Sequence, residues 1–166
     1  MWHWLVQIGQ DRGGMYSYDW LENVFGLRIH SADHIDPRWQ RLTAGDRVRL
    51  VRRGWLGMRE GYALPVVRLE PGRSLVLRQK PPEHPWDSVW SFHVLPLDGE
   101  QCRLLSRTRA AFHPGPTRLA SEAMWPVTFA FTRKMLLGIK QRAERCCEDG
   151  EDPITLYSTS PQRRPA

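Results

Sequence analysis

Cysteine is scarce in this sequence, and its placement excludes the usual cysteine-based scaffolds. Only three of the 166 residues are cysteines, and two of them are neighbours at positions 146 and 147. No Cys-x-x-Cys pair or Cys/His spacing typical of zinc ligands occurs. Phosphate-binding loops, paired carboxylates and serine–histidine–acid sets do not stand out either. We therefore expect no disulfide framework, no metal site and no bound cofactor.

Long apolar runs and targeting signals are missing as well. No stretch of about 18 consecutive apolar residues occurs, so no segment is expected to span a membrane. Residues 1–14 lack the basic start, the apolar stretch and the small-residue cleavage site of a secretory signal peptide. These absences predict a cytoplasmic protein.

Lysine is scarce too, and this limits what the positive charge implies. The formal net charge of +6 raises nucleic acid or an acidic ligand as partners. However, Lys80, Lys134 and Lys140 are the only lysines, and the arginines are spread from Arg12 to Arg164 without forming a cluster. An arginine-driven nucleic-acid or protein-binding module is therefore the weakest of the hypotheses, and nucleic acid is not an expected partner.

The strongest helical signal covers residues 122–146. Apolar residues recur there at steps of mostly three and four, and cations gather toward the C-terminal end, where the helix dipole favours them. Pro126 is unfavourable in a helix interior, so the pattern predicts a helix start near Trp125 or a kink. Gly138 leaves a gap on the apolar face, where another backbone or a ligand could come close.

The preceding residues predict two short helices followed by a sheet. Residues 1–8 and 17–26 each carry an apolar stripe at helical spacing, and Ser17 is a plausible N-cap of the second. Runs of strands and segregated helices predict an α+β fold, with a curved antiparallel sheet around a long C-terminal helix. We expect one domain over residues 1–146 and a disordered polar tail over 147–166. The expected strands, joined by tight turns, are 46–52, 62–70, 73–80, 86–97 and 101–112.

Three blocks of the chain resemble one family. They are WLVQIGQDRGGMYSYDWLENVFG at 4–26, HSADHIDPRWQRLTAGDRVRL at 30–50 and FTRKMLLGIKQRAE at 131–144. In this order they are similar to a bacterial branch of the SRPBCC superfamily, the START-like, helix-grip proteins often labelled polyketide cyclase/dehydrase. The resemblance implies a curved sheet that grips the C-terminal helix around a deep apolar pocket. It does not imply one activity, since members include ligand carriers, cyclases and receptors.

The sequence departs from the family at its start. Family members normally begin with a β-strand before the helix that here begins MWHWL at residue 1. We therefore expect the domain over residues 1–146 to lack this first strand. A missing strand would expose unpaired backbone groups and lower solubility.

The leading functional hypothesis is non-catalytic binding of a small apolar or aromatic molecule between sheet and helix. Such pockets combine apolar walls with a few polar contacts. Side chains of the sheet and helix are expected to form the walls, hydroxyl groups the polar contacts, and two tyrosines the rim. The candidate ligand-binding residues are Tyr16, Tyr18, Trp90, Phe92, Val94, Ser106, Thr108, Phe131 and Met135.

Strand alternation leaves one uncertainty in this pocket. If Trp90 faces the helix, His93 faces the opposite side and is exposed, which argues against a general-base role. Ser106 shares a face with Thr108, whereas Arg107 and Arg109 share the other. In the reversed register, the two arginines would be buried and could bind an acidic ligand, and the sequence leaves that register open.

The second hypothesis is an enzyme of the cyclase/dehydrase type. Its acid–base and oxyanion-stabilising groups would be Arg12, Tyr18 and Asp19, which belong to the densest polar and aromatic cluster of the sequence. The alternative is that this cluster only shapes a turn between two helices, with Asp11 and Arg12 pairing or capping. Whether the chain is an enzyme stays open at this point.

Overall fold

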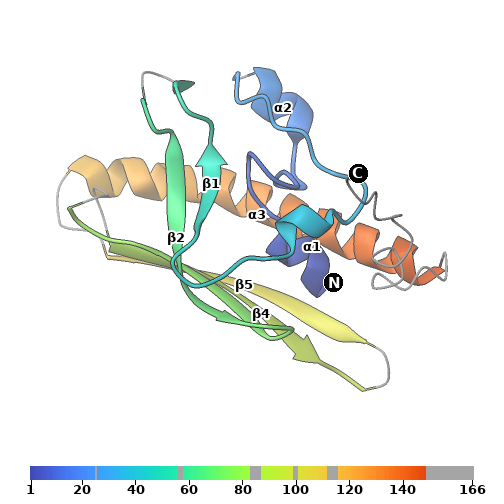
Figure 1. The fold of residues 1–166 in the computed structure, drawn as a ribbon. Coiled ribbons are helices and arrows are strands. Elements are labelled where there is room, and N and C mark those ends of the chain that lie inside the picture. Colours follow the sequence, from blue (N-terminus) through green and yellow to red (C-terminus); the bar gives the residue numbers. More distant parts are fainter. Residues whose placement is uncertain (25, 56–57, 83–86, 99–100, 112–115, 149–166) are drawn as a thin grey trace, which may run out of the picture.

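The computed structural model describes residues 1–24, 26–55, 58–82, 87–98, 101–111 and 116–148. Its core element is one antiparallel sheet whose five strands follow one another in the order of the chain. Figure 1 shows the long helix crossing one face of this sheet, with two strands rising beside it. The elements are α1 (Trp2–Val6), α2 (Asp19–Val24), the 3-10 helix η1 (Pro37–Trp39), β1 (Arg47–Val51), β2 (Tyr62–Glu70), β3 (Ser74–Gln79), β4 (Asp87–Pro96), β5 (Cys102–Ala111) and α3 (Pro116–Glu148).

The predicted α+β architecture is confirmed. The sheet is curved and unclosed, α3 is the long C-terminal helix, and two short helices precede the strands, which is compatible with a helix-grip fold. All five strands begin and end within two residues of the predicted bounds. None of the helices in the described part of the chain is long and apolar enough to cross a membrane.

The helices differ from the prediction at their ends. The helix α3 begins at Pro116 and contains Pro126, so it does not start near Trp125. It also runs through Glu148, two residues into the segment 147–166 that we expected to be disordered. The remainder of that segment, residues 149–166, lies outside the described residues. Helix α2 begins at Asp19, later than the predicted N-cap at Ser17.

The register of the sheet settles which side chains share a face. Trp90 pairs with Thr108 and Phe92 pairs with Ser106, while Ser91 pairs with Arg107. Phe92 is fully buried among residues of α3, so its face is the concave face toward the helix. Arg107 therefore lies on the convex face, together with the exposed residues at alternate positions of β5.

The core lies at the C-terminal half of α3. Its side chains there, with those of α1 and the concave face, form one cluster of buried residues. By contrast, all residues of 125–130 are exposed. The segment 125–130 of the long helix is therefore not buried against this core. The buried members of the cluster are Trp4, Leu5, Val6, Ile8, Tyr16, Leu42, Val48, Leu64, Val66, Leu75, Leu77, Phe92, Met135, Ile139 and Ala143.

A close approach of backbone to backbone holds α3 in place. A Cβ added at Gly138 would collide with the carbonyl oxygen of Tyr16 and lie 3.0 Å from the Tyr16 Cβ. The backbone of Tyr16 has a φ of 55°, a left-handed conformation that residues other than glycine rarely adopt. The predicted gap at Gly138 is thus filled by the backbone of the loop between α1 and α2.

The substitution Gly138→Ala should therefore destabilise the protein. At an ordinary helix position, alanine in place of glycine stabilises by about 1 kcal/mol. Here the added methyl group overpacks a buried contact, which typically costs about 1–3 kcal/mol. We expect a lower midpoint of urea unfolding for Gly138→Ala, while Arg133→Ala at an exposed position of α3 leaves it nearly unchanged. A stabilised Gly138→Ala variant would contradict the close approach.

Candidate functional site

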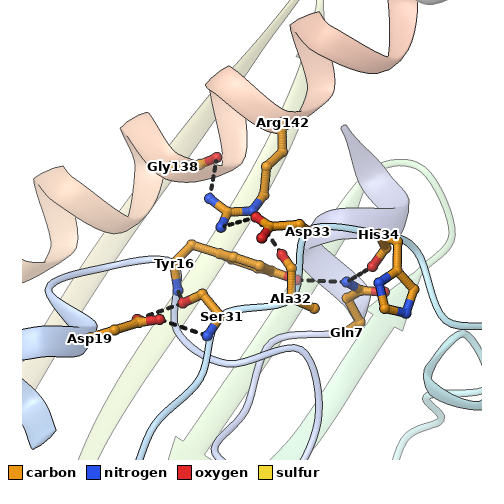
Figure 2. Close-up of polar contacts among 9 residues, drawn as sticks. All are labelled: Gln7, Tyr16, Asp19, Ser31, Ala32, Asp33, His34, Gly138 and Arg142. Carbon is orange, nitrogen blue, oxygen red and sulfur yellow. Dashed lines mark hydrogen bonds and ion pairs between the residues drawn. The ribbon is translucent and has the colours of Figure 1, made fainter.

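Tyr16 is the centre of a buried polar network beside α3 (Figure 2). Its side chain is only 2% exposed, and its hydroxyl accepts a hydrogen bond of 2.8 Å from Gln7 Nε2. The ring packs edge-on against Trp4, with 5.9 Å between the ring centroids. The guanidinium of Arg142 lies over the same ring, 4.8 Å from its centroid. Tyr16 therefore belongs to the core and does not form the rim of a pocket, which corrects the prediction from the sequence.

The amide of Gln7 connects α1 to the segment 34–40. Its Nε2 also donates to the carbonyl oxygen of His34 at 3.1 Å. Its Oε1 accepts from the backbone N–H of Asp36 at 3.1 Å and from Gln40 Nε2 at 3.2 Å. Most buried amide groups in proteins have hydrogen-bond partners, and these contacts supply them to both the nitrogen and the oxygen of the Gln7 amide.

Asp19 serves as a clamp on Ser31. One carboxylate oxygen accepts from the Ser31 backbone N–H at 2.7 Å, and the other accepts from the Ser31 hydroxyl at 2.6 Å. The same hydroxyl accepts from the backbone N–H of Tyr16 at 2.9 Å. Through Ser31, Asp19 therefore connects the segment around residue 31 to the backbone of Tyr16.

Arg142 completes the network from the helix. Its Nε donates to the carbonyl oxygen of Ala32 at 2.8 Å, and its Nη2 forms an ion pair of 3.0 Å with Asp33. Next to it lies a polar cleft with a volume of about 210 Å³. The residues that line this cleft are Tyr16, Ser17, Asp19, Ser31, Lys134, Gly138, Gln141 and Arg142.

The three predicted catalytic residues have separate neighbours. Arg12 donates to the carbonyl oxygen of Trp39, and burial lowers the pKa of its guanidinium against the opposing effect of nearby carboxylates. Tyr18 instead packs against α3, with its ring centroid 5.5 Å from that of Phe131 and 5.8 Å from Lys134 Nζ. Asp19 is held by Ser31, so the contacts of these groups do not join them into one reacting centre.

The concave face brings together the predicted aromatic and hydroxyl residues of the sheet. Trp90 Nε1 donates to Ser106 Oγ at 2.9 Å, and the Trp90 and Phe92 ring centroids are 4.8 Å apart. Thr108 lies opposite Trp90 and is exposed. Phe92 and Met135 are buried in the core, whereas Trp90 is only partly buried. Val94 and Phe131 are also half-buried.

Gln79 is a residue of this face that was not predicted from the sequence. It is buried, and its Nε2 donates to Ser88 Oγ at 2.6 Å. Its Oε1, like Gln10 Oε1 and Arg12 Nε, is buried and has no hydrogen-bond partner among the described residues. The alternation of β3 could have revealed it, because Leu75, Leu77 and Gln79 share the inward face and only the last is polar. A buried acceptor without a donor is rare in a folded protein, so this oxygen marks a place where a donor could bind.

No match to a known protein or family assigns a function to this chain. No family model matches it, and neither does a curated protein or a solved structure. Within the described residues, no group of three His, Cys, Asp or Glu side chains could hold a metal ion. The function must therefore be inferred from the geometry of the chain itself.

Because the Tyr16 hydroxyl is buried, we expect its contribution to the free energy of unfolding to depend on pH in the alkaline range. Burial raises the pKa of Tyr16 to about 12, although the hydrogen bond from Gln7 and the charge of Arg142 oppose this. An unfolded tyrosine has a pKa of about 10. Between pH 10 and about 12 the unfolded state loses the proton first, so the Tyr16 contribution to stability is intact below pH 10 and is lost as pH rises.

The variant Tyr16→Phe should test this. At pH 8 it should be less stable by about 1 kcal/mol, because Gln7 loses one acceptor. Above pH 10 the free-energy difference from wild type should shrink or reverse, since phenylalanine cannot ionise. The measurement is urea unfolding at several values of pH, and a difference that stays constant from pH 8 to 12 would argue against a buried phenol.

Proposed function

We propose that the chain is a helix-grip domain of the SRPBCC type that binds a small apolar or aromatic molecule without catalysis. The ligand lies on the concave face of β3–β5, beneath the N-terminal half of α3. The observation that carries this proposal is the buried Oε1 of Gln79, which has no hydrogen-bond partner within the described part of the chain. The remaining support comes from the side chains around it.

The unpartnered oxygen of Gln79 defines the polar part of the ligand. A buried acceptor without a donor costs about 1–3 kcal/mol, and a ligand that donates a hydrogen bond recovers much of it. Gln79 pairs with Ser88 and lies diagonal to Trp90, roughly 7–8 Å away by strand geometry. A ligand that stacks on Trp90 can therefore also reach Gln79.

Small side chains lie beside Trp90 toward β5 and toward the start of β4, whereas Leu77 and Phe92 flank its other sides. Ser88 and Ala110 pair with each other, and Thr108 lies opposite Trp90. Because these residues are small, they leave space beside the partly buried Trp90 ring. An aromatic ligand is favoured there, since stacked rings gain about 0.5–1.5 kcal/mol beyond the area that they bury. Ser106, already bonded to Trp90 Nε1, fixes the orientation of the indole.

The exposed segment 125–130 of α3 supplies the apolar cover. Trp125 lies 18 residues before Ala143, roughly five helical turns, so it points in the same direction as that buried residue. Even so, Trp125 is 43% exposed, and Phe129 on the next turn is 68% exposed. Phe131 extends this surface toward Tyr18. A ligand between these rings and the sheet would bury apolar surface that is otherwise in water.

The core members of the predicted set have a supporting role in this proposal. Phe92 of β4 and Met135 of α3 are buried in the same core cluster, which packs the sheet against α3. Val94 packs against the same cluster. A cyclase/dehydrase activity is the less favoured alternative, because Asp19 and Arg12 are occupied by structural contacts and no observation assigns them an acid–base role.

The binding test uses two naphthalenes that differ in one donor. We expect the protein to bind 1-naphthol about tenfold more tightly than 1-methoxynaphthalene, because only the hydroxyl donates to Gln79. The substitution Gln79→Leu should remove this preference, and Thr108→Trp should block both ligands. Isothermal titration calorimetry measures the dissociation constants.

The matched control is Ser91→Ala on the convex face of the neighbouring strand, which should leave the tenfold preference unchanged. Thermal unfolding of each variant establishes that it is folded. Equal affinity of wild type for the two naphthalenes, or a preference that survives Gln79→Leu, would refute the role of Gln79.

A further inference from the structure

The convex face of the sheet carries an imbalance of charge. Among the described residues of β2–β5, its acidic side chains are Glu70 and Asp87. Each is already bonded to an arginine, Glu70 to Arg68 and Asp87 to Arg78, the latter at 2.9 Å. These hydrogen bonds hold the pKa of both carboxyl groups below the usual range. Neither carboxylate is therefore free to neutralise another cation.

The arginines of β5 are the cations of the convex face that these two carboxylates do not neutralise. Arg103, Arg107 and Arg109 are exposed and share the convex face by strand alternation. Within the part of the chain that the structure describes, none of them forms an ion pair. Three unneutralised guanidinium groups on one strand repel one another, which a bound anion would relieve.

Two of these arginines border a cleft. It has a volume of about 250 Å³ and lies over the middle of the convex face. Its floor is apolar or neutral, with half-buried valines and a buried serine whose hydroxyl donates to the Arg107 carbonyl oxygen at 3.3 Å. No carboxylate is among the described residues that line it. These residues are Val76, Val89, Ser91, His93, Arg107 and Arg109.

The number of donors at this cleft indicates the class of anion. Two residues apart on a strand, Arg107 and Arg109 have Cα atoms roughly 6.6–6.8 Å from each other, so their long side chains can converge on one group. Each guanidinium offers five N–H donors in a planar fork. One fork saturates the two oxygens of a carboxylate. A phosphate monoester has three terminal oxygens and a charge near −2, so it can accept hydrogen bonds from both forks.

We propose that this cleft binds the terminal phosphate group of a phosphate monoester. Arg107 and Arg109 donate to the phosphate oxygens, and Val76 and Val89 contact the carbon atoms next to the ester. The described residues lining the cleft include no tryptophan, tyrosine or phenylalanine on which a base could stack, so a single-stranded nucleic acid is disfavoured. The cleft is separated from the concave face by the sheet, so its occupancy does not depend on the apolar ligand.

The test measures binding of phenyl phosphate and of inorganic phosphate at fixed ionic strength, by calorimetry. The double substitution Arg107→Gln/Arg109→Gln should weaken phenyl phosphate binding by at least about tenfold. The matched control is Arg133→Gln/Arg145→Gln, which removes the same charge from two exposed positions of α3 and should leave binding unchanged. If the control variant lost as much affinity for phenyl phosphate, the weakening would be due to net charge alone, and the proposal would be overturned.

A second variant pair separates forked donors from point charges. Arg107→Lys/Arg109→Lys keeps the charge but loses the planar fork, so we expect it to lose most of the affinity. Full affinity in this variant, or no binding of phenyl phosphate to wild type, would overturn the proposed recognition. Vesicles that contain phosphatidic acid distinguish the source of the ligand. Preferential binding to these vesicles would support a lipid headgroup, and binding of phenyl phosphate alone a soluble monoester.

Discussion

The contact between the Tyr16 backbone and Gly138 is the constraint on which the rest of the structure depends. It brings the loop after α1 directly onto α3, with no side chain between the two backbones. From this point Tyr16 extends its hydroxyl to Gln7 and its ring to Arg142, while Ser31 holds its backbone N–H. A larger residue at position 138 would displace the loop and, with it, each of these contacts.

The burial of α3 changes along its length. Beyond Gly138, toward the C-terminus, Ile139 and Ala143 are buried against α1 and the sheet. On the N-terminal side, residues 125–130 are exposed although they include large apolar side chains. The chain thus builds its core with residues in the C-terminal half of the helix and leaves residues 125–130 exposed. The proposed binding surface lies where the packing of the helix ends.

The sequence could predict the order of the elements but not which side chains of the concave face would be covered. Alternation placed Ser106 and Thr108 on one face and Arg107 and Arg109 on the other, and the register agrees. The gap at Gly138 was also predicted, because a glycine on an apolar helix face leaves room for a neighbouring backbone. The burial of Tyr16 could not be predicted, because no local sequence pattern relates it to its partners Gln7 and Arg142. Gln79 was missed because a two-residue period identifies a face and not the depth at which its polar residues lie.

The order of the strands has a consequence for how the chain folds. Every strand pairs with the next one in the sequence, so the whole sheet can assemble from successive hairpins with short loop closures. The attachment of Tyr16 at Gly138, by contrast, joins the two ends of the domain across all five strands. Loop closure over so long a segment is entropically costly until the sheet has shortened the distance. We therefore expect the sheet to form first and the attachment of the helix to complete folding.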